Sequence, residues 1–141
     1  MIQEFYGTVV SPKGFQAIGV AAGVKKGKYD LALLVSDVPA EVAACFTTNV
    51  VKAASVLRNQ ALLKAGKKIR AVAVNSGNAN ACTGLEGKKA NEEMARTLAE
   101  AIGAQTDEVW TASTGVIGVP FPIDTIKKGI EAAVPALGNW V

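Results

Sequence analysis

The sequence predicts an α/β fold (mixed α+β) in which a mixed sheet packs with helices on one side. Half of the 141 residues are hydrophobic, so residues 1–141 can bury the core of a single domain. Strand and helix patterns alternate in the second half, as in α/β proteins, whereas the first half is denser in strand patterns and suggests a meander or hairpin. The sequence shows no repeat, low-complexity tract or linker.

The first half of the chain is expected to form three strands joined by turns. Residues 11–14 read Ser-Pro-Lys-Gly, which is typical of a turn, and residues 15–24 follow as a strand whose small residues allow close backbone approach. A hairpin turn at 27–30 leads to a buried strand at 31–36. An Ala-rich third strand is expected at 42–47.

The second half carries the alternation of helices and strands. We expect, in order, helix 53–63, strand 69–74, helix 85–102, strand 109–112 and helix 126–137. Thr83 and Glu86 have the spacing of a helix capping box, and Gly103 follows the last turn of that helix as a C-cap. Pro135 cannot donate a helical hydrogen bond, so the final helix should kink or stop near it.

Charge and hydropathy limit the classes of partner. Fifteen basic and twelve acidic residues give a net charge of +3, and four Lys-Lys pairs are spread along the chain with few aromatic neighbours. These pairs are interpreted as solvated surface, so we expect no nucleic-acid partner. The apolar runs are far shorter than a membrane span, and residues 1–4 lack the pattern of a secretory signal, so we expect a cytoplasmic protein without a membrane segment.

The chain has two cysteines and no histidine. Cys45 and Cys82 are expected to be free thiols in a reducing compartment and to occupy small, buried or half-buried positions. Without histidine the chain has no Ser-His-Asp triad, no Cys-His pair and no His-ligated metal, and no metal site is predicted. Catalysis by this chain would therefore use backbone dipoles, hydroxyls, lysines, carboxylates or groups on another chain.

The first candidate site is the segment 75–84, which reads Asn-Ser-Gly-Asn-Ala-Asn-Ala-Cys-Thr-Gly between a predicted strand and a predicted helix. Strand ends that lead into helices are common ligand sites in α/β proteins. The amides of Asn75, Asn78 and Asn80 could line the wall of a pocket for a polar ligand. Asparagine side chains also satisfy their own turns, and the residues alone leave both interpretations open.

The second candidate site is Ser113-Thr114-Gly115, directly after the predicted strand 109–112. A Thr-Gly pair there can aim a hydroxyl and a backbone N–H at one point, which is what an oxyanion hole requires. Glycine lets a reacting carbonyl approach the backbone closely. The plain alternative is a strand-to-loop turn, because such a tripeptide is common.

Two long motifs resemble those of the ornithine acetyltransferase family, the glutamate N-acetyltransferases and amino-acid acetyltransferases of arginine biosynthesis. They are Val-Asn-Ser-Gly-Asn-Ala-Asn-Ala-Cys-Thr-Gly at 74–84 and Ala-Ser-Thr-Gly-Val-Ile-Gly-Val-Pro at 112–120. Supporting segments occur in the family's order at 12–15, 30–33, 46–49 and 51–54. The chain is similar to the N-terminal α-chain portion of that family.

The resemblance implies a precursor that cuts itself before an internal threonine, which becomes the N-terminal nucleophile of a β chain. That threonine would take the acetyl group from N-acetylornithine and pass it to glutamate in a ping-pong sequence, with no cofactor and with acetyl-CoA as a further donor in some members. Thr114 and Gly115 would form the oxyanion hole. The implied assembly is an α2β2 heterotetramer in which the β chain completes a layered α/β sandwich.

The resemblance is incomplete at the C-terminal end. The family's α chain continues for some tens of residues past a position like Val141, through a Thr-Thr-Asp segment, to the Ala before the nucleophile. The chain is therefore expected to be a fragment, or one piece of a protein split earlier, and to be inactive alone. Two other functions fit the residues: a related self-cleaving aminopeptidase-type hydrolase, and a non-catalytic α/β module that binds a small molecule.

Overall fold

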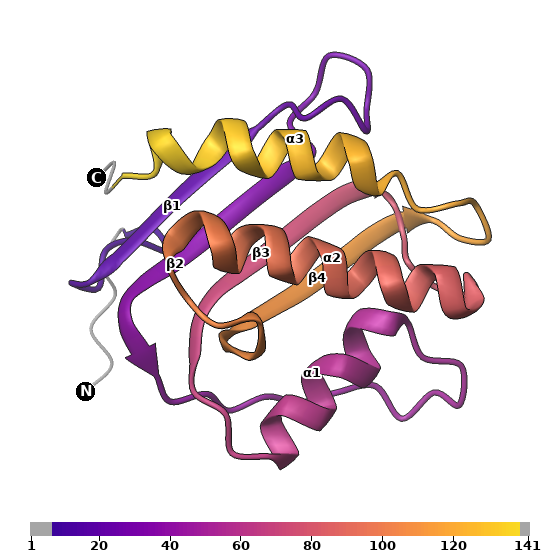
Figure 1. The fold of residues 1–141 in the computed structure, drawn as a ribbon, viewed down its shortest axis with the longest axis horizontal. Helices are drawn as coiled ribbons and strands as arrows, with labels where there is room; N and C mark the ends of the chain where they lie inside the picture. The colour runs from indigo at the N-terminus through magenta and orange to yellow at the C-terminus, as the bar shows by residue number, and fades with distance from the viewer. Residues whose placement is uncertain (1–6, 139–141) are drawn as a thin grey trace.

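The computed structural model describes residues 7–138 and places four strands in one sheet, in the order β1-β2-β3-β4 (Figure 1). The strands are β1 (Phe15–Val20), β2 (Leu31–Ala40), β3 (Ile69–Asn78) and β4 (Val109–Val116). β1 pairs antiparallel with β2 and β2 with β3, whereas β4 runs parallel to β3. The sheet is therefore mixed, and the predicted α/β class is confirmed.

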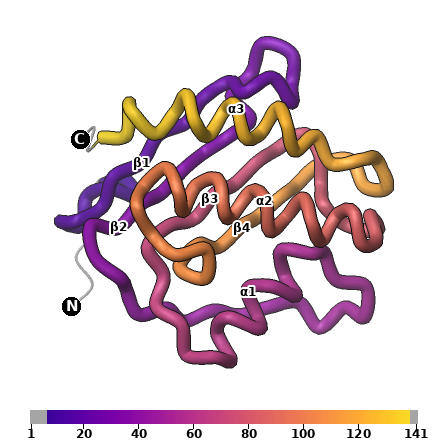
Figure 2. The backbone as a smooth tube through the Cα atoms, in the orientation of Figure 1, coloured from indigo at the N-terminus to yellow at the C-terminus, as the bar shows by residue number. Residues whose placement is uncertain are grey.

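Three α-helices accompany the sheet: α1 (Ala54–Lys64), α2 (Gly84–Ile102) and α3 (Ile123–Ala133). α2 and α3 lie side by side across one face, and α1 lies at the outer edge beside β4 (Figures 1 and 2). α2 is the crossover that lets β3 and β4 run in the same direction. Within residues 7–138, no helix combines the length and the apolar composition needed to cross a bilayer.

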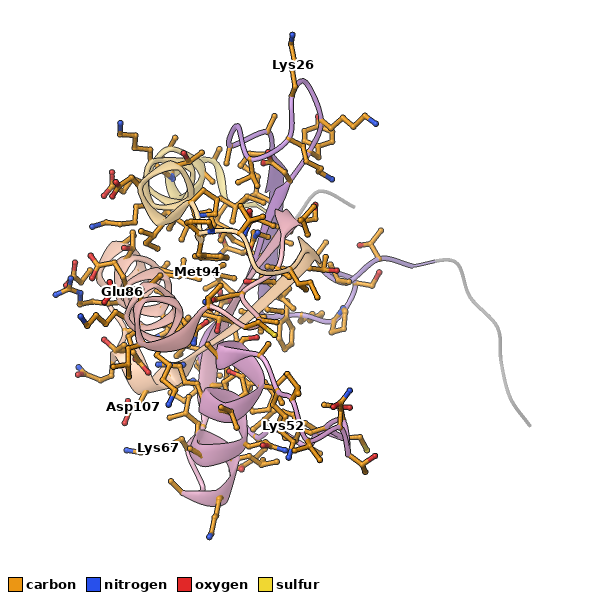
Figure 3. All side chains as sticks on the ribbon, turned by 90° about the vertical axis from the view of Figure 1, so that its right-hand side faces the viewer. Lys26, Lys52, Lys67, Glu86, Met94 and Asp107 are labelled. Atoms are coloured by element: carbon orange, nitrogen blue, oxygen red, sulfur yellow. The ribbon has the colours of Figure 1, made fainter. Side chains whose placement is uncertain are left out.

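The hydrophobic core lies between the sheet and the helices α2 and α3, with Met94 of α2 facing the strands (Figure 3). Its largest fully buried side chains are Leu31, Leu33, Met94, Leu98, Val109, Ile126 and Ile130. The opposite face of the sheet carries an apolar groove of about 530 Å³, whose lining includes Ala17, Leu34, Val72 and Val74. In the described part of the chain no helix covers this face, so the sheet is packed on one side (Figure 3).

β1 ends at Val20, earlier than the predicted 15–24, because the chain turns there around a buried carboxylate. The Asp30 side chain accepts hydrogen bonds from the backbone N–H groups of Ala22 at 2.6 Å, Gly23 at 3.1 Å and Lys25 at 2.7 Å. Burial raises the pKa of this carboxyl, but the backbone donors outweigh that effect and hold the pKa below its ordinary value. An ionised Asp30 thus fixes the β1–β2 loop.

The strand predicted at 42–47 is wrong: these residues form no strand in the structure. β2 continues to Ala40 and already has β1 and β3 on its two edges. The first half of the outer β4 edge is bonded to α1 as far as Thr111, and segment 42–47 instead packs a side chain against the sheet: the Phe46 ring lies 5.9 Å from the Trp110 ring of β4, centroid to centroid. An Ala-rich segment gains little from extended structure without a partner strand.

The helix ends agree in part with the sequence. Gly103 is the C-cap of α2 with φ of 67°, and α3 stops at Ala133 before a 3₁₀ turn, Val134–Ala136, that contains Pro135, so both expectations are confirmed. The predicted capping box is wrong. Thr83 donates its hydroxyl to the side-chain carbonyl of Asn80 at 2.6 Å, and Glu86 pairs with a lysine one turn on.

Both cysteines are free, as predicted, but both are exposed, so the expected burial is wrong. Cys45 lies in the extended connection that forms no strand, outside the core. Cys82 lies in the turn before α2 with φ of 58°, the left-handed region that non-glycine residues seldom adopt.

Candidate functional site

The parallel register of β3 and β4 brings the two candidate motifs together. Asn75 is the partner of Ser113, Ser76 of Thr114 and Gly77 of Gly115. Both strands are longer than predicted, so residues 75–78 and 113–116 belong to the sheet and not to loops. The two motifs therefore form one site at the carboxyl ends of neighbouring parallel strands, a common position for ligand sites in α/β proteins.

Gly115 allows the two strand ends to approach more closely than any side chain would permit. Its φ is 133°, a backbone conformation that L side chains rarely adopt. A Cβ atom on Gly115 would lie 2.6 Å from the backbone nitrogen of Asn78 and 2.6 Å from the carbonyl oxygen of Gly77. Gly77 is restricted in the same way, with φ of 106° and the stem of Lys25 packed against it. A side chain at Gly115 would overlap the backbone of β3, and one at Gly77 would have to displace the Lys25 stem.

Thr114 and Gly115 are exposed, whereas the residue before them is half-buried. Because side chains alternate along a strand, Thr114 and its partner Ser76 point away from the helices, and Ser113 points toward them. The site thus presents a threonine hydroxyl and an adjacent glycine backbone to the outside of the sheet. These are two donors of the kind that stabilise a negative oxygen.

The three asparagines of the first motif lie behind this surface and bond to the local backbone. Asn75 donates to the carbonyl of Asn78 at 2.9 Å, Asn78 to that of Ala79 at 3.0 Å, and Asn80 to that of Gly87 at 2.8 Å. Asn75 and Asn80 are fully buried. Their amides hold the turn between β3 and α2, and their role as a pocket wall stays a prediction.

Two buried polar atoms beside the site have no hydrogen-bond partner among the described residues. They are the side-chain carbonyl oxygen of Asn75 and the hydroxyl of Ser113, which are register partners on the helix side of the sheet. One is an acceptor and the other can donate, so this register pair is the least satisfied polar position beside Thr114 and Gly115.

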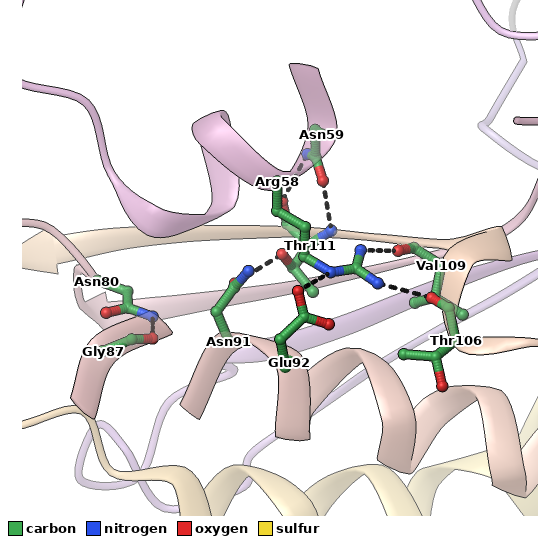
Figure 4. A network of polar contacts seen from close by, with 9 residues as sticks. All are labelled: Arg58, Asn59, Asn80, Gly87, Asn91, Glu92, Thr106, Val109 and Thr111. Carbon is green, nitrogen blue, oxygen red and sulfur yellow. Dashed lines mark hydrogen bonds and ion pairs between the residues drawn. The ribbon is translucent and has the colours of Figure 1, made fainter. Parts of the chain in front are cut away.

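The outer edge of β4 is held by side chains of α1 (Figure 4). Arg58 donates to the carbonyls of Val109 and Thr106 and pairs with Glu92 at 2.9 Å. Asn59 donates to the carbonyl of Thr111 at 2.9 Å and accepts from its N–H at 3.4 Å. These bonds stop at Thr111, so the strand end that carries the candidate site is free of them.

In residues 7–138, no group of three or more His, Cys, Asp or Glu side chains gathers in one place. The groups at the strand ends are hydroxyls, amides and backbone N–H. Such a set can bind and polarise a carbonyl or hold a carboxylate. It contains no strong base.

A family model matches residues 16–140, nearly the whole chain, and its description is "ArgJ family". The chain belongs to the ArgJ family. Curated ArgJ proteins, named arginine biosynthesis bifunctional proteins, are identical to this chain at about half of the aligned positions. The one from Bacillus anthracis is 51% identical over 130 residues, and the one from Caldanaerobacter subterraneus subsp. tengcongensis is 48% identical over 133 residues.

The chain spans about a third of these relatives. The aligned region is 92% of this chain and 32% of the Bacillus anthracis protein. Two solved structures resemble it, each at 42% identity. One is an ArgJ protein from Bacillus halodurans, with a TM-score of 0.85 over 89% of this chain and 65% of that chain. The other is an ornithine acetyltransferase complexed with ornithine from Mycobacterium tuberculosis, with a TM-score of 0.88 over 94% of this chain and 72% of that chain. These likenesses agree with the predicted family and with an N-terminal position in it.

The sequence of this ArgJ chain gives little sign of the network on the β4 edge. Arg58 and Asn59 lie in a predicted helix where polar residues normally face solvent, yet the Arg58 side chain is only 8% exposed and Asn59 is buried. Asn91 of α2 is buried as well and accepts from the hydroxyl of Thr111 at 2.7 Å. The sequence would indicate such a buried polar residue only by its place on the core-facing side of a helix, and that side is known only once the helix is placed against the sheet.

Proposed function

We propose that this chain is the N-terminal, α-chain part of an ornithine acetyltransferase, which moves an acetyl group from N-acetylornithine to glutamate in arginine biosynthesis. Family membership supports the pathway and the transfer of an acetyl group. The neighbouring Mycobacterium tuberculosis structure, an ornithine acetyltransferase complexed with ornithine, supports the amino-acid substrate. The ping-pong order and the division of roles between two chains are part of the proposal.

The observation that carries the chemistry is the exposed Thr114-Gly115 pair at the end of β4, held against Gly77 at a distance that only glycine allows. In the proposed first step, a threonine hydroxyl at the N-terminus of the β chain attacks the acetyl carbonyl. The carbonyl oxygen becomes negative and is bound by the Thr114 hydroxyl and the Gly115 N–H. The C–N bond then breaks, and ornithine leaves with the proton that the hydroxyl gave up.

The second step reverses the first with a different amine. The amino group of glutamate attacks the acetyl-threonine ester, the same two donors bind the oxygen again, and the threonine hydroxyl is regenerated as N-acetylglutamate forms. The free α-amine of the nucleophilic threonine serves as the base in both steps. This arrangement needs no histidine, which agrees with the absence of histidine from this chain.

The proposal places the remaining parts of the enzyme outside this chain. The β chain arises by self-cleavage of one precursor, and two copies of each form an α2β2 assembly. The uncovered apolar face of the sheet is a suitable surface for it, because a groove lined by Val72 and Val74 would otherwise remain in water. We propose no bound cofactor, acetyl-CoA as a possible second donor substrate, and a cytoplasmic location.

The test removes the Thr114 hydroxyl and keeps its shape. In the assembled enzyme, Thr114→Val should lower kcat for transfer from N-acetylornithine to glutamate about a hundredfold with little change in KM, because the hydroxyl acts on the transition state. Thr114→Ser, which keeps the hydroxyl, should retain most of the activity. Wild-type kcat in the valine variant would overturn the role of Thr114. Acetate release without glutamate would favour the hydrolase alternative instead.

A further inference from the structure

The outer edge of β4 has two halves: at Val109 and Thr111 the backbone is bonded to α1 (the closed half), and at Ser113 and Gly115 it is not (the open half). In a strand, the N–H and C=O groups of alternate residues point to the same edge. The carbonyl of Val116 accepts from Ala79 of the β3 turn, so the even-numbered residues of β4 face β3. Val109 and Thr111 face α1, and the same alternation directs the N–H groups of Ser113 and Gly115 to this outer edge.

At Thr111, the Asn59 side chain makes the two hydrogen bonds that a neighbouring strand would make. A carboxamide has one donor and one acceptor side by side, as a peptide unit does. Asn59 uses both on one residue, donating to the Thr111 carbonyl and accepting from the Thr111 N–H (Figure 4). The side chain is buried, so water does not compete for these bonds. An edge strand presents unpaired N–H and C=O groups, and Asn59 pairs both of these groups at Thr111.

Thr111 is also fixed from inside the fold. Its hydroxyl donates to Asn91 of α2 at 2.7 Å, and its side chain is buried. The strand then continues without an edge partner for four residues, about 13 Å, to Gly115. At that end the contact with Gly77 and the bond from Ala79 hold only the β3 side. The direction of the Gly115 N–H toward the open edge therefore depends on how β4 is held at Thr111.

We propose that Asn59 is a positioning residue for acetyl transfer: it aligns β4 so that the Gly115 N–H and the Thr114 hydroxyl meet the carbonyl oxygen of the substrate. The inference rests on the proposed function and adds a residue that touches neither substrate nor nucleophile. Small displacements of a catalytic donor lower transition-state stabilisation more than substrate binding, because the ground-state carbonyl bonds weakly.

The experiment compares Asn59→Asp with wild type in the enzyme assembled from this chain and its β chain. Aspartate has the shape of asparagine and still accepts from the Thr111 N–H, but it cannot donate to the Thr111 carbonyl. We expect kcat for transfer to glutamate to fall about tenfold with KM changed less than twofold. Thr97→Ala is the matched control, since Thr97 is a buried residue whose hydroxyl bonds within α2 to Glu93 at 2.8 Å. It should leave kcat unchanged.

A double-mutant cycle separates positioning from general destabilisation. If Asn59 acts through the oxyanion hole, the Asn59→Asp effect should shrink to about threefold or less when Thr114→Val is already present. A full tenfold effect in both backgrounds, or an assembled Asn59→Asp enzyme with wild-type kcat, would overturn the proposal. If Asn59→Asp fails to assemble, Asn59→Ala replaces it in the same cycle, because it leaves no charge beside the Thr111 carbonyl.

Hydrogen exchange gives a readout that does not depend on turnover. Loss of the Asn59 bonds should raise the exchange rate of the Thr111 amide, and of the amides at 112, 114 and 116 that face β3, about tenfold and leave those of β2 unchanged. Equal exchange in the variant and the wild type would overturn the positioning role. A wild-type enzyme that transfers no acetyl group would refute the proposed function instead, and the exchange result would still report whether Asn59 holds β4.

Discussion

Replacing Arg58 by methionine should destabilise the fold far more than replacing any surface arginine. The Arg58 side chain is only 8% exposed, and its guanidinium donates to the carbonyls of Thr106 and Val109 as well as to Glu92. Methionine has a similar length and keeps the packing of the stem, but it leaves two carbonyls without their donor. The variant therefore isolates the polar part of the interaction.

The magnitude follows from the exposure of each partner. Glu92 is 58% exposed, so the ion pair itself contributes at most about 1 kcal/mol. The two backbone carbonyls receive charge-assisted bonds, each contributing about 1.5 kcal/mol or more. We expect the free energy of unfolding to fall by about 3 kcal/mol. Arg58→Lys should recover less than half of this loss, because one ammonium does not reproduce the fork of a guanidinium.

Urea unfolding followed by far-UV circular dichroism measures the difference, with Arg96→Met as the matched control. The Arg96 side chain is 54% exposed and pairs with Glu93 one turn away on the same helix, so its loss should cost about 0.5 kcal/mol or less. The decisive quantity is the difference between the two variants in the loss of free energy of unfolding. If they differ by less than about 1 kcal/mol, the buried guanidinium does not hold α1 to the sheet edge, and the reasoning is refuted.

Two further predictions concern stability. Gly87→Ala should lower the free energy of unfolding by about 2 kcal/mol although alanine is the better helix former, because the new Cβ would overlap the Thr83 hydroxyl and the Asn80 side-chain carbonyl. Gly19→Ala is the control: Gly19 has open space around it, so the change should be near neutral in the same unfolding assay. Since the pKa of Asp30 is lowered on folding, its contribution is present above the unfolded-state pKa near 4 and is lost as pH falls through the folded-state value. Asp30→Asn should therefore cost about 2 kcal/mol at neutral pH, and its gap to wild type should narrow on acidification toward pH ~3; a constant gap would contradict the charge argument.

The elements that the sequence predicted well are those whose pattern is local. The strand at 69–74 is rich in β-branched and other apolar residues, and α2 ends at Ile102 before Gly103, where a residue tolerant of positive φ is favoured. The strand predicted at 42–47 was wrong for a tertiary reason, because a strand forms only where its backbone pairs with another strand, and this segment packs Phe46 against Trp110 without pairing. The six residues of this segment do not show whether the folded sheet will offer them a partner strand.

The candidate site divides in the same way. Thr114 and Gly115 were predicted at a strand end from their chemistry and from the family resemblance, and the structure places them beside Ser76 and Gly77. The parallel register that joins the two motifs was not predicted, because it depends on the crossover through α2. Asn59 was missed altogether, since a buried asparagine in a helix has the same sequence pattern as an exposed one.

The open surfaces of this domain converge on one place. The helices cover one face of the sheet and α1 covers the first half of the β4 edge, so the uncovered face and the uncovered edge meet at the end of β4. Gly115 lies at that corner with its N–H directed to the open edge, and Thr114 points to the open face. In the proposed function, the β chain packs on the open face and brings its nucleophile to both donors. Because α1 bonds the β4 edge as far as Thr111, no further strand can pair along that half of the edge.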